Sequence, residues 1–533
     1  MHPRRRLATL AWANVDPTSN APMRAQNLVR GKWISSSNQP SVILDPLNRQ
    51  TQLQLVENTS VDELQQFRSH LFECQKSGLH NPLKHPQRLV EYGQVAYKLA
   101  EELEKPEVEE FFAKLIQRVM PKSTAQCLGE VRVTRQFLKS FAGDSVRFSL
   151  GRSFAVSGDH AGQQSHGYRW PYGPVMVIAP FNFPLEIPVL QIMGALFAGN
   201  RVLLKPSEKV AIVMDQFVRL MLHCGMDSQD LLVLNSPGKV AQEIATDPRM
   251  RLVQFTGSGG VAERLSQGTG GKVRIEDAGF NWKLLGPKLR PYDEHVEDYV
   301  VHVCDQDAYA ASGQKCSATS CLFVHTDWQG IVPKLATLAS KRNVRDLTIG
   351  PVLSWTNKQI RAHIDRVLHQ VPNARVEFGG KALAQEQVPE HYGMVEPTAI
   401  RCHVRDVMSS NEAFEAFSIE LFGPFQIIVD YGDEDLDLVL KVTERLGHHL
   451  TCAVVSEDPN FCHRVLSNTV NGTTYVGMRA RTTGAPTNHW FGPAGDPRGA
   501  GIGTVESILH VWTCHREIVN DTLEPNKQKL VQT

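Results

Sequence analysis

The stretch "VMVIAPFNFPLEIPVLQIMGALFAGNRVLLK", residues 175–205, contains two short apolar runs on either side of a longer one. The first run ends at Pro180 and the last covers residues 201–205, and both have the length and composition of buried strands. Pro184 near the start and Gly199 at the end delimit a helix between them. The stretch therefore predicts a strand–helix–strand unit, the repeating element of a parallel sheet.

The same stretch is long and apolar enough to raise the question of a membrane span. Asn182, Glu186 and three prolines interrupt it, so no continuous run of about 20 apolar residues remains. We therefore expect a buried strand, a turn and a buried helix there, and no membrane contact.

Strand and helix patterns keep alternating on the C-terminal side of this unit, while residues 60–145 before it have mainly helical periodicity. A helical pattern ends at Gly225, and short apolar strands follow at residues 231–235, 251–258 and 272–277. Such alternation predicts a parallel sheet covered by helices on both faces. This is a doubly wound α/β domain of the dinucleotide-binding kind.

A second α/β region begins after about Leu285 and includes the strand patterns "ELFGPFQIIVDY" and "LTCAVVS". Its end, residues 471–504, is so rich in glycine that we expect loops there and no packed helix or regular strand. Residues 145–170 alternate polar and apolar side chains like a hairpin. We therefore expect two α/β domains and a β-hairpin arm.

The composition is that of a water-soluble globular protein: 533 residues, 42% hydrophobic and 21% charged, with a formal net charge of zero. A neutral chain gives no electrostatic reason to bind nucleic acid. The ten cysteines form no CxxC pair and no Cys/His cluster with zinc spacing. We therefore expect a reducing compartment and no metal site.

Polar side chains follow several of the predicted strands, where the ligands of α/β domains bind. "GQKCSATS", residues 313–320, places a cysteine between a lysine and a serine, and its thiolate would be a nucleophile. The glycines of "FTGSGG", residues 255–260, would let a phosphate approach the N–H groups of a helix start. A nucleophile, an amide donor, a carboxylate base and ribose-binding groups are all present, as Cys316, Asn182, Glu276, Lys205, Glu208 and Glu420.

These motifs, in this order, resemble the aldehyde dehydrogenase superfamily over about residues 28–520. The resemblance implies an NAD-dependent oxidoreductase in which Cys316 is the nucleophile, Asn182 an oxyanion-hole donor and Glu276 the general base. It further implies that NAD, preferred over NADP, is held by Phe181, Lys205, Glu208, Gly257, Ser258, Glu420 and Phe422.

"GQKCSA", "IEDAGFNWKLLGP" and "NHWFGPAGDPRGAGIGT" look like the plant-type Δ1-pyrroline-5-carboxylate dehydrogenases. This implies oxidation of L-glutamate γ-semialdehyde to L-glutamate in proline catabolism, with substrate contacts from Lys315, Ser317, Gly501 and Ile502. Two features depart from the superfamily pattern. "EDAGF" replaces its usual Gly-Gly pair, and Cys316 lies forty residues beyond the base glutamate, which we attribute to a surface insertion at residues 287–298.

The resemblance also implies a domain layout. Residues 25–144 and 168–285 would form the NAD-binding domain and residues 286–507 the catalytic domain, while residues 145–167 and 508–533 would form an oligomerisation arm and tail. A homo-oligomer built from dimers is expected. Residues 1–24, whose first 15 positions hold three arginines and no acid, are expected to be a flexible or targeting segment that directs the chain to the mitochondrial matrix.

Three other interpretations of the function remain open. The chain could be a dehydrogenase for another semialdehyde, such as succinic semialdehyde, within the same superfamily. A thiol hydrolase or acyltransferase would pair Cys316 with one of the 20 histidines and would not need Lys205 or Glu208. A non-enzymatic NAD-binding protein would not need the nucleophile.

Overall fold

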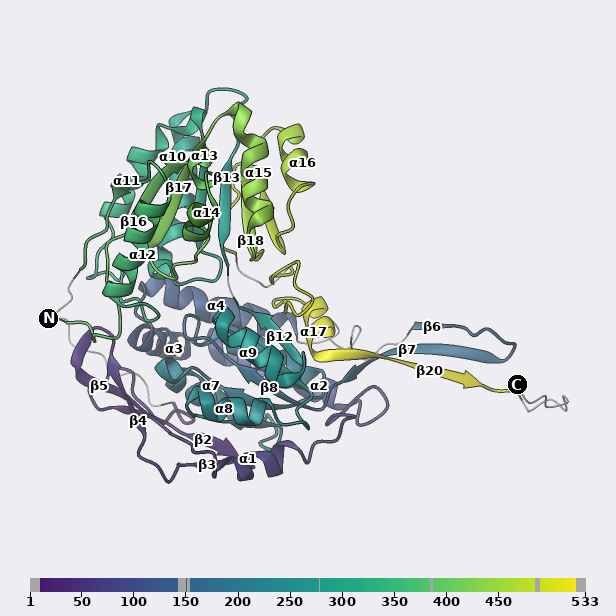
Figure 1. Cartoon of the computed structure of the whole chain (residues 1–533). Coiled ribbons are helices and arrows are strands. Elements are labelled where there is room, and N and C mark those ends of the chain that lie inside the picture. The colour runs from purple at the N-terminus through teal and green to yellow at the C-terminus, as the bar shows by residue number, and fades with distance from the viewer. Residues whose placement is uncertain are drawn as a thin grey trace.

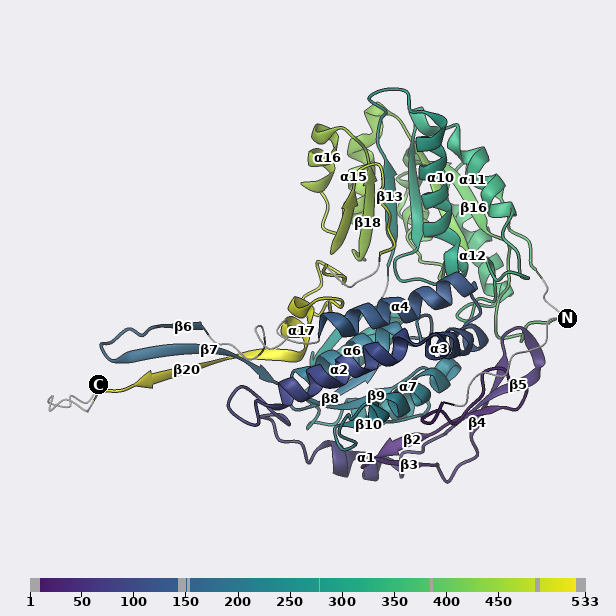
Figure 2. The ribbon, with the colours of Figure 1, turned by 180° about the vertical axis from the view of Figure 1, so that it is seen from behind.

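The computed structural model describes residues 10–141, 150, 154–277, 279–383, 387–484 and 489–523. Two α/β regions lie one above the other, and a narrow three-stranded arm extends from the lower one (Figure 1). The view from behind shows helices covering the sheet of the lower region (Figure 2). The predicted α/β class, with two domains and an arm, is confirmed.

The sheet of the lower region has seven strands in the order β12-β11-β8-β9-β10-β2-β3. Its first five strands are parallel, as predicted, because a helix between consecutive strands returns the chain to the same edge. These strands are β8 (Pro174–Ile178), β9 (Arg201–Lys205), β10 (Leu231–Val233), β11 (Leu252–Thr256) and β12 (Val273–Glu276). The intervening helices are α6 (Glu186–Phe197), α7 (Ala211–His223), α8 (Gly238–Ala245) and α9 (Gly259–Thr269).

The helical periodicity of residues 60–145 is confirmed as far as residue 141, where the described stretch ends. The helices are α1 (Leu64–Leu71), α2 (Arg88–Glu104), α3 (Pro106–Val119) and α4 (Thr124–Ser140). Both α2 and α4 contact α6, whose twelve residues are all buried. The stretch that suggested a membrane span is thus the centre of a core, and no helix in the described ranges could cross a membrane.

The segment before residue 25 was expected to be a flexible or targeting segment, and the part of it that the structure describes packs against the folded domain. Trp12 stacks on Phe112 with ring centroids 5.6 Å apart. Strand β1 (Met23–Ala25) pairs with β5 (Asn48–Val56), which also pairs with β4 (Ser41–Asp45). Two short strands, β2 (Asn27–Val29) and β3 (Lys32–Ile34), then extend the main sheet. Residues 1–9, which carry the arginines, lie outside the described residues.

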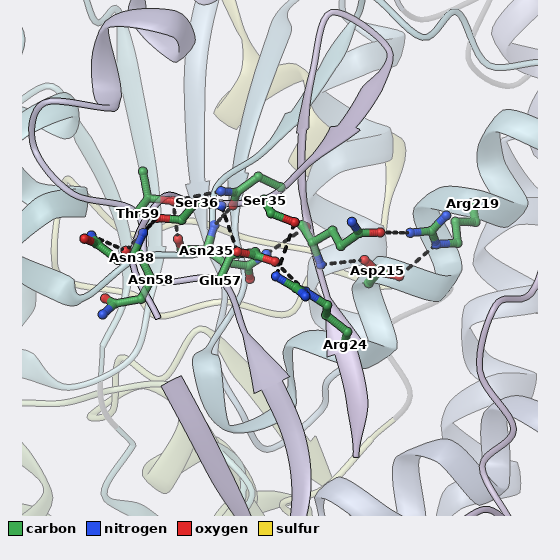
Figure 3. A network of polar contacts seen from close by, with 12 residues as sticks. Arg24, Ser35, Ser36, Asn38, Glu57, Asn58, Thr59, Asp215, Arg219 and Asn235 are labelled. Atoms are coloured by element: carbon green, nitrogen blue, oxygen red, sulfur yellow. Dashed lines mark hydrogen bonds and ion pairs between the residues drawn. The ribbon is translucent and has the colours of Figure 1, made fainter. Parts of the chain in front are cut away.

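A polar network joins this N-terminal segment to the main sheet (Figure 3). Arg24 Nε donates to the buried Glu57 carboxylate at 2.8 Å, and the Gln26 N–H donates to Asp215 of α7 at 2.9 Å. Thr59 donates to the carbonyl of Asn235, beyond β10. Because these acceptors are buried, the segment is part of the folded domain.

The upper region has a second seven-stranded sheet in the order β15-β16-β17-β14-β13-β18-β19. Its strands are β13 (Asn281–Leu285), β14 (Thr319–His325), β15 (Arg375–Phe378), β16 (Thr398–His403), β17 (Phe425–Tyr431), β18 (Thr451–Val455) and β19 (Thr473–Val476). Its helices are α10 (Glu294–Tyr309), α11 (Ile331–Ser340), α12 (Asn357–Gln370), α13 (Val404–Val407), α14 (Asn411–Phe417), α15 (Leu436–Arg445) and α16 (Pro459–Leu466). The predicted domain limit at residue 285 is wrong, because the chain changes sheets between residues 276 and 281.

The glycine-rich end was expected to contain no regular strand, and this is wrong at its start, where β19 pairs with β18. Further on, the chain returns to the lower region: Gly499 bridges Ile275 of β12, and Ile502 belongs to the lower core. Helix α17 (Val505–Trp512) packs on α6. The upper domain therefore ends well before the predicted limit at residue 507.

The arm is a three-stranded antiparallel sheet in the order β20-β7-β6. The expected hairpin consists of β6 (Phe154–Ser157) and β7 (Gln163–Pro171), and β20 (Thr513–Asp521) adds a third strand. The arm reaches residue 171, beyond the predicted limit at residue 167, and its C-terminal strand begins at residue 513, later than the predicted residue 508.

Candidate functional site

The candidate site lies at the carboxyl edge of the lower sheet. Strands β9, β11 and β12 end at Lys205, Thr256 and Glu276, and all three residues line a cavity of about 550 Å³, the larger cavity. Parallel strands end at one edge, so residues far apart in the sequence meet there. Its volume falls within the usual range of small-molecule sites.

Nine predicted residues line the larger cavity: Phe181, Asn182, Lys205, Gly257, Ser258, Glu276, Cys316, Glu420 and Phe422. Glu208 does not, because it begins the short helix η1 (Glu208–Val210) and its side chain is exposed. Burial lowers the pKa of Lys205, while the charge of Glu208 opposes that shift, so the two side chains still influence each other. Ser354 and Trp355 also line this cavity and were missed from the sequence.

A smaller cavity of about 260 Å³ lies on the other side of Cys316. Lys315, Ser317 and Ile502, which were expected to contact the substrate, line it. Gly501 does not line it: a Cβ there would lie 2.4 Å from the Trp490 ring, so this glycine makes room for a tryptophan. Cys316 borders both cavities and can therefore react with a molecule in one while a second molecule occupies the other.

The loop that carries Cys316 has an unusual backbone. Ala311, Ser312 and Gly313 all have φ between 55° and 66°, in the left-handed region. Such a conformation costs about 1–3 kcal/mol for a residue other than glycine, so surrounding contacts must stabilise it. Ser312 Oγ accepts from the Gly350 N–H at 2.7 Å, and a Cβ on Gly313 would lie 2.0 Å from the Gly423 carbonyl oxygen. The loop is thus held against the segment that contains Glu420.

Asn281, which sequence reasoning missed, fixes the backbone of Cys316. Its Nδ2 donates to the carbonyl oxygens of Cys316 at 2.7 Å and Ala318 at 2.8 Å, while its Oδ1 accepts from the Thr451 N–H at 3.0 Å. A Cβ on Gly279 would lie 2.2 Å from the Cys316 carbonyl oxygen. The single glycine of "EDAGF" therefore leaves the space that the Cys316 carbonyl oxygen occupies.

Cys316 and Glu276 lie in a buried site that raises the pKa of both groups. Burial and then the carboxylate of Glu276 raise the pKa of the Cys316 thiol, while burial raises the pKa of Glu276 to about 7. Neither Glu276 oxygen has a hydrogen-bond partner within the residues that the structure describes. A carboxyl group with a pKa near 7 is well matched to a general base.

Asn182 is positioned by a buried ion pair that was also missed. Lys122 Nζ lies 2.6 Å from Glu130 Oε2 and donates to the Asn182 carbonyl at 3.1 Å, and both charged side chains are fully buried. The Asn182 amide donates to the carbonyl of Gln314, two residues before Cys316, at 3.1 Å. The amide and the nucleophile are therefore adjacent.

Other candidate groups are separated from this site. Cys321 is buried on β14, in the core of the upper sheet, which fits a structural thiol. No histidine lines either cavity in the described part of the chain, so Cys316 lacks the partner that a thiol hydrolase would use. Among the same residues, no group of three His, Cys, Asp or Glu side chains is arranged to hold a metal ion.

Comparison with known proteins is consistent with this geometry. Residues 87–508 match the aldehyde dehydrogenase family. The chain is 53% identical over 504 residues to mitochondrial Delta-1-pyrroline-5-carboxylate dehydrogenase 12A1 of Arabidopsis thaliana, covering 94% of this chain and 89% of that protein. It is 50% identical to a probable aldehyde dehydrogenase of Linum usitatissimum, covering 96% and 92%. Betaine aldehyde dehydrogenase of Staphylococcus aureus, solved with NAD+, shares the fold at a TM-score of 0.80, with 19% identity and coverage of 95% and 98%.

Proposed function

Because the chain belongs to the aldehyde dehydrogenase family, we propose that it oxidises L-glutamate γ-semialdehyde, the open form of Δ1-pyrroline-5-carboxylate, to L-glutamate in proline catabolism. The observation that carries this proposal is the position of Cys316 between two cavities, one for a cofactor and one for an aldehyde. The 53% identity to a Delta-1-pyrroline-5-carboxylate dehydrogenase supports the substrate.

The reaction begins when Cys316 Sγ forms a bond to the aldehyde carbon. The thiol gives up its proton to solvent as this bond forms. The aldehyde oxygen becomes an oxyanion, which the Asn182 amide and the Cys316 N–H stabilise. That N–H has no acceptor within the described residues, so it is free to donate. Loss of one such donor typically lowers the rate about a hundred- to a thousandfold.

The larger cavity fits NAD. It lies at the carboxyl edge of the parallel strands, and the N-terminus of α9, at Ser258 and Gly259, opens into it, where N–H groups favour a pyrophosphate. NAD held there would supply the acceptor for the hydride of the substrate carbon. Lys205 and Glu208 would hold the adenosine ribose, whereas Glu420 and the aromatic pair Phe181–Phe422, 6.0 Å apart, would contact the nicotinamide side.

Glu276 acts after oxidation. Its carboxylate takes a proton from water, the hydroxide attacks the Cys316 thioester, and the C–S bond breaks to release L-glutamate. The Cys316 thiolate then recovers the proton held by Glu276. Ser317 and the backbone near Ile502 hold the substrate carboxylate in the smaller cavity, with Lys315 as a nearby positive charge. Burial lowers the pKa of Lys315 to about 8, so an anion in the cavity would favour its protonated form.

We place the chain in mitochondria, as the name of the Arabidopsis relative states for that protein. The arm supports a homo-oligomer built from dimers, because β6 and β20 lie at the edges of its sheet and leave backbone groups available for pairing.

A panel of aldehydes assayed with NAD and with NADP tests the function. We expect NADH formation with the highest kcat/KM for L-glutamate γ-semialdehyde. A higher kcat/KM for succinic semialdehyde would favour the other dehydrogenase class. Absence of NADH with every aldehyde, together with hydrolysis of a thioester, would favour the thiol hydrolase.

A further inference from the structure

The smaller cavity carries an acidic side chain that neither the mechanism nor the sequence motifs use. Glu186 is the first residue of α6 and lines the cavity together with Lys315 and Arg481. The three ionisable groups come from separate parts of the chain: α6, the loop of the nucleophile, and the loop after β19. They give the small space charges of both signs.

Glu186 is buried without a partner. Its residue is 7% exposed, and no hydrogen bond or ion pair to its carboxylate occurs in the ranges described. Buried carboxyl groups are normally hydrogen-bonded or paired, because desolvation is costly. A buried, unpartnered carboxyl group on a cavity wall therefore indicates a missing ligand with hydrogen-bond donors.

The neighbouring Glu130 shows what a satisfied carboxylate looks like at this place. It pairs with Lys122 and accepts from the backbone N–H groups of Leu185 at 2.8 Å and Glu186 at 3.2 Å. Glu130 therefore has no capacity left for a ligand, and the positive charge of Lys122 is already neutralised. Any cation that enters the smaller cavity has Glu186 as its available acceptor.

We propose that the Glu186 carboxylate binds the α-ammonium group of the amino-acid aldehyde, which makes it the residue that distinguishes this substrate from aldehydes without an amine. The inference rests on the proposed function. Burial and the charge of Glu130 raise the pKa of Glu186 to about 8, and a bound ammonium group favours its ionised form. Lys315 and Arg481 line the same cavity and supply positive charge for the substrate carboxylate.

The test compares two aldehydes of equal chain length that differ in the amine alone: L-glutamate γ-semialdehyde and 5-oxopentanoate. Hydrogen bonds between charged groups contribute strongly to binding. Glu186→Gln should therefore lower the ratio of kcat/KM for L-glutamate γ-semialdehyde to kcat/KM for 5-oxopentanoate about ten- to a hundredfold. Val133→Thr, an uncharged change on the same cavity wall, should leave the ratio within about threefold of wild type. An unchanged ratio in Glu186→Gln would overturn the inference.

Equilibrium binding of the products provides a measurement without catalysis. Calorimetric titration of L-glutamate and glutarate into wild type and Glu186→Gln should show at least a tenfold loss of affinity for L-glutamate and less than about threefold for glutarate. Equal losses would overturn the inference, and a melting curve shows whether the variant is folded. If wild type forms no NADH from L-glutamate γ-semialdehyde, the proposed function fails first, whatever the variants do.

Discussion

The two cavities that meet at Cys316 are built in different ways. The larger one is lined by residues at the ends of β9, β11 and β12 and by short loops next to them. The smaller one is lined by α4, the start of α6, the nucleophile loop and the chain that returns after residue 489. A cavity at strand ends can be recognised from local motifs, whereas one assembled from helices and a returning segment cannot.

The charges of the two cavities differ as well. In the larger cavity burial raises the pKa of Glu276 to about 7 and of Glu420 to about 8. Both carboxyl groups line this cavity together with Cys316. The smaller cavity combines Glu186 with Lys315 and Arg481. We infer that the larger cavity serves the chemistry common to the family and the smaller one selects a zwitterion.

Cys316→Ala should have the largest effect, because this residue belongs to both cavities. We expect dehydrogenase activity to disappear while NAD still binds, since the walls of the larger cavity stay intact. Fluorescence titration with NADH checks binding, and NADH absorbance checks turnover. Cys321→Ala, five residues away, is the control and should remain active. If Cys316→Ala kept more than a few per cent of activity, and alkylation of Cys321 removed it, the nucleophile would be Cys321.

Glu276→Gln should separate the two halves of the reaction. Acylation and hydride transfer can still occur once, but the water that cleaves the thioester loses its base. We expect a burst of NADH in a rapid-quench experiment, followed by turnover about a hundredfold or more slower than in wild type. A variant without the burst but with fast thioester hydrolysis would contradict the role given to Glu276.

Ser317→Ala acts on the smaller cavity alone. A hydrogen bond to a charged group is worth about 1.5–3 kcal/mol, so kcat/KM for L-glutamate γ-semialdehyde should fall about ten- to a hundredfold. A simple aliphatic aldehyde without a carboxylate should be little affected. Equal losses for both aldehydes would mean that Ser317 supports the nucleophile, and the division between the two cavities would not hold at this residue.

The pH dependence should report on the larger cavity. The base must be ionised to act, and burial raises the pKa of Glu276 to about 7. The rate of thioester hydrolysis should therefore rise about tenfold per pH unit below pH 7 and level off above it. Single-turnover measurements between pH 5.5 and pH 8.5 check this, and a rate that falls as pH increases over that range would exclude a carboxylate base.

The sequence predicted the parallel strands and the residues that follow them because both depend on local patterns. Apolar runs bounded by glycine or proline identified β8 and β9, and the polar residues after them were placed correctly. Glu208 is the exception in the larger cavity. It was expected to hold the cofactor together with Lys205, yet it lies three residues beyond the end of β9, on η1, and its side chain is exposed.

The contacts that complete the site depend on the tertiary fold and could not be predicted in this way. Asn281 holds the Cys316 carbonyl across 35 residues of chain, and Lys122 reaches Asn182 across 60. Asn281 lies within "IEDAGFNWKLLGP", but nothing local to that motif indicates its contact with the Cys316 carbonyl, and Lys122 lies in no recognisable motif. The position of Trp12 against Phe112 likewise follows from packing, and a basic, acid-poor start gives no sign of it.

The smallest effect is expected from Glu208→Gln, because this residue lies outside the wall of the larger cavity. A carboxylate there can accept a hydrogen bond from the ribose 2′-hydroxyl and repel the 2′-phosphate of NADP. Its side chain is exposed, and charges near a surface interact by at most a few kcal/mol, so we expect the ratio of kcat/KM for NAD over NADP to fall only a few-fold. Lys209→Gln, one residue further along η1, removes a positive charge instead; Lys209 is half-buried, donates to the Leu353 carbonyl and lies 5.1 Å from the ring centroid of Phe181. It should raise the same ratio or leave it unchanged, because a cation near the ribose would favour the phosphate.

The measurement is steady-state kinetics with both cofactors at low ionic strength, where screening is weakest. Equal efficiency of wild type with NAD and NADP would contradict the predicted preference for NAD. No change in Glu208→Gln would show that the preference depends on the cavity wall, with Lys205 and Ser207 as the next residues to change.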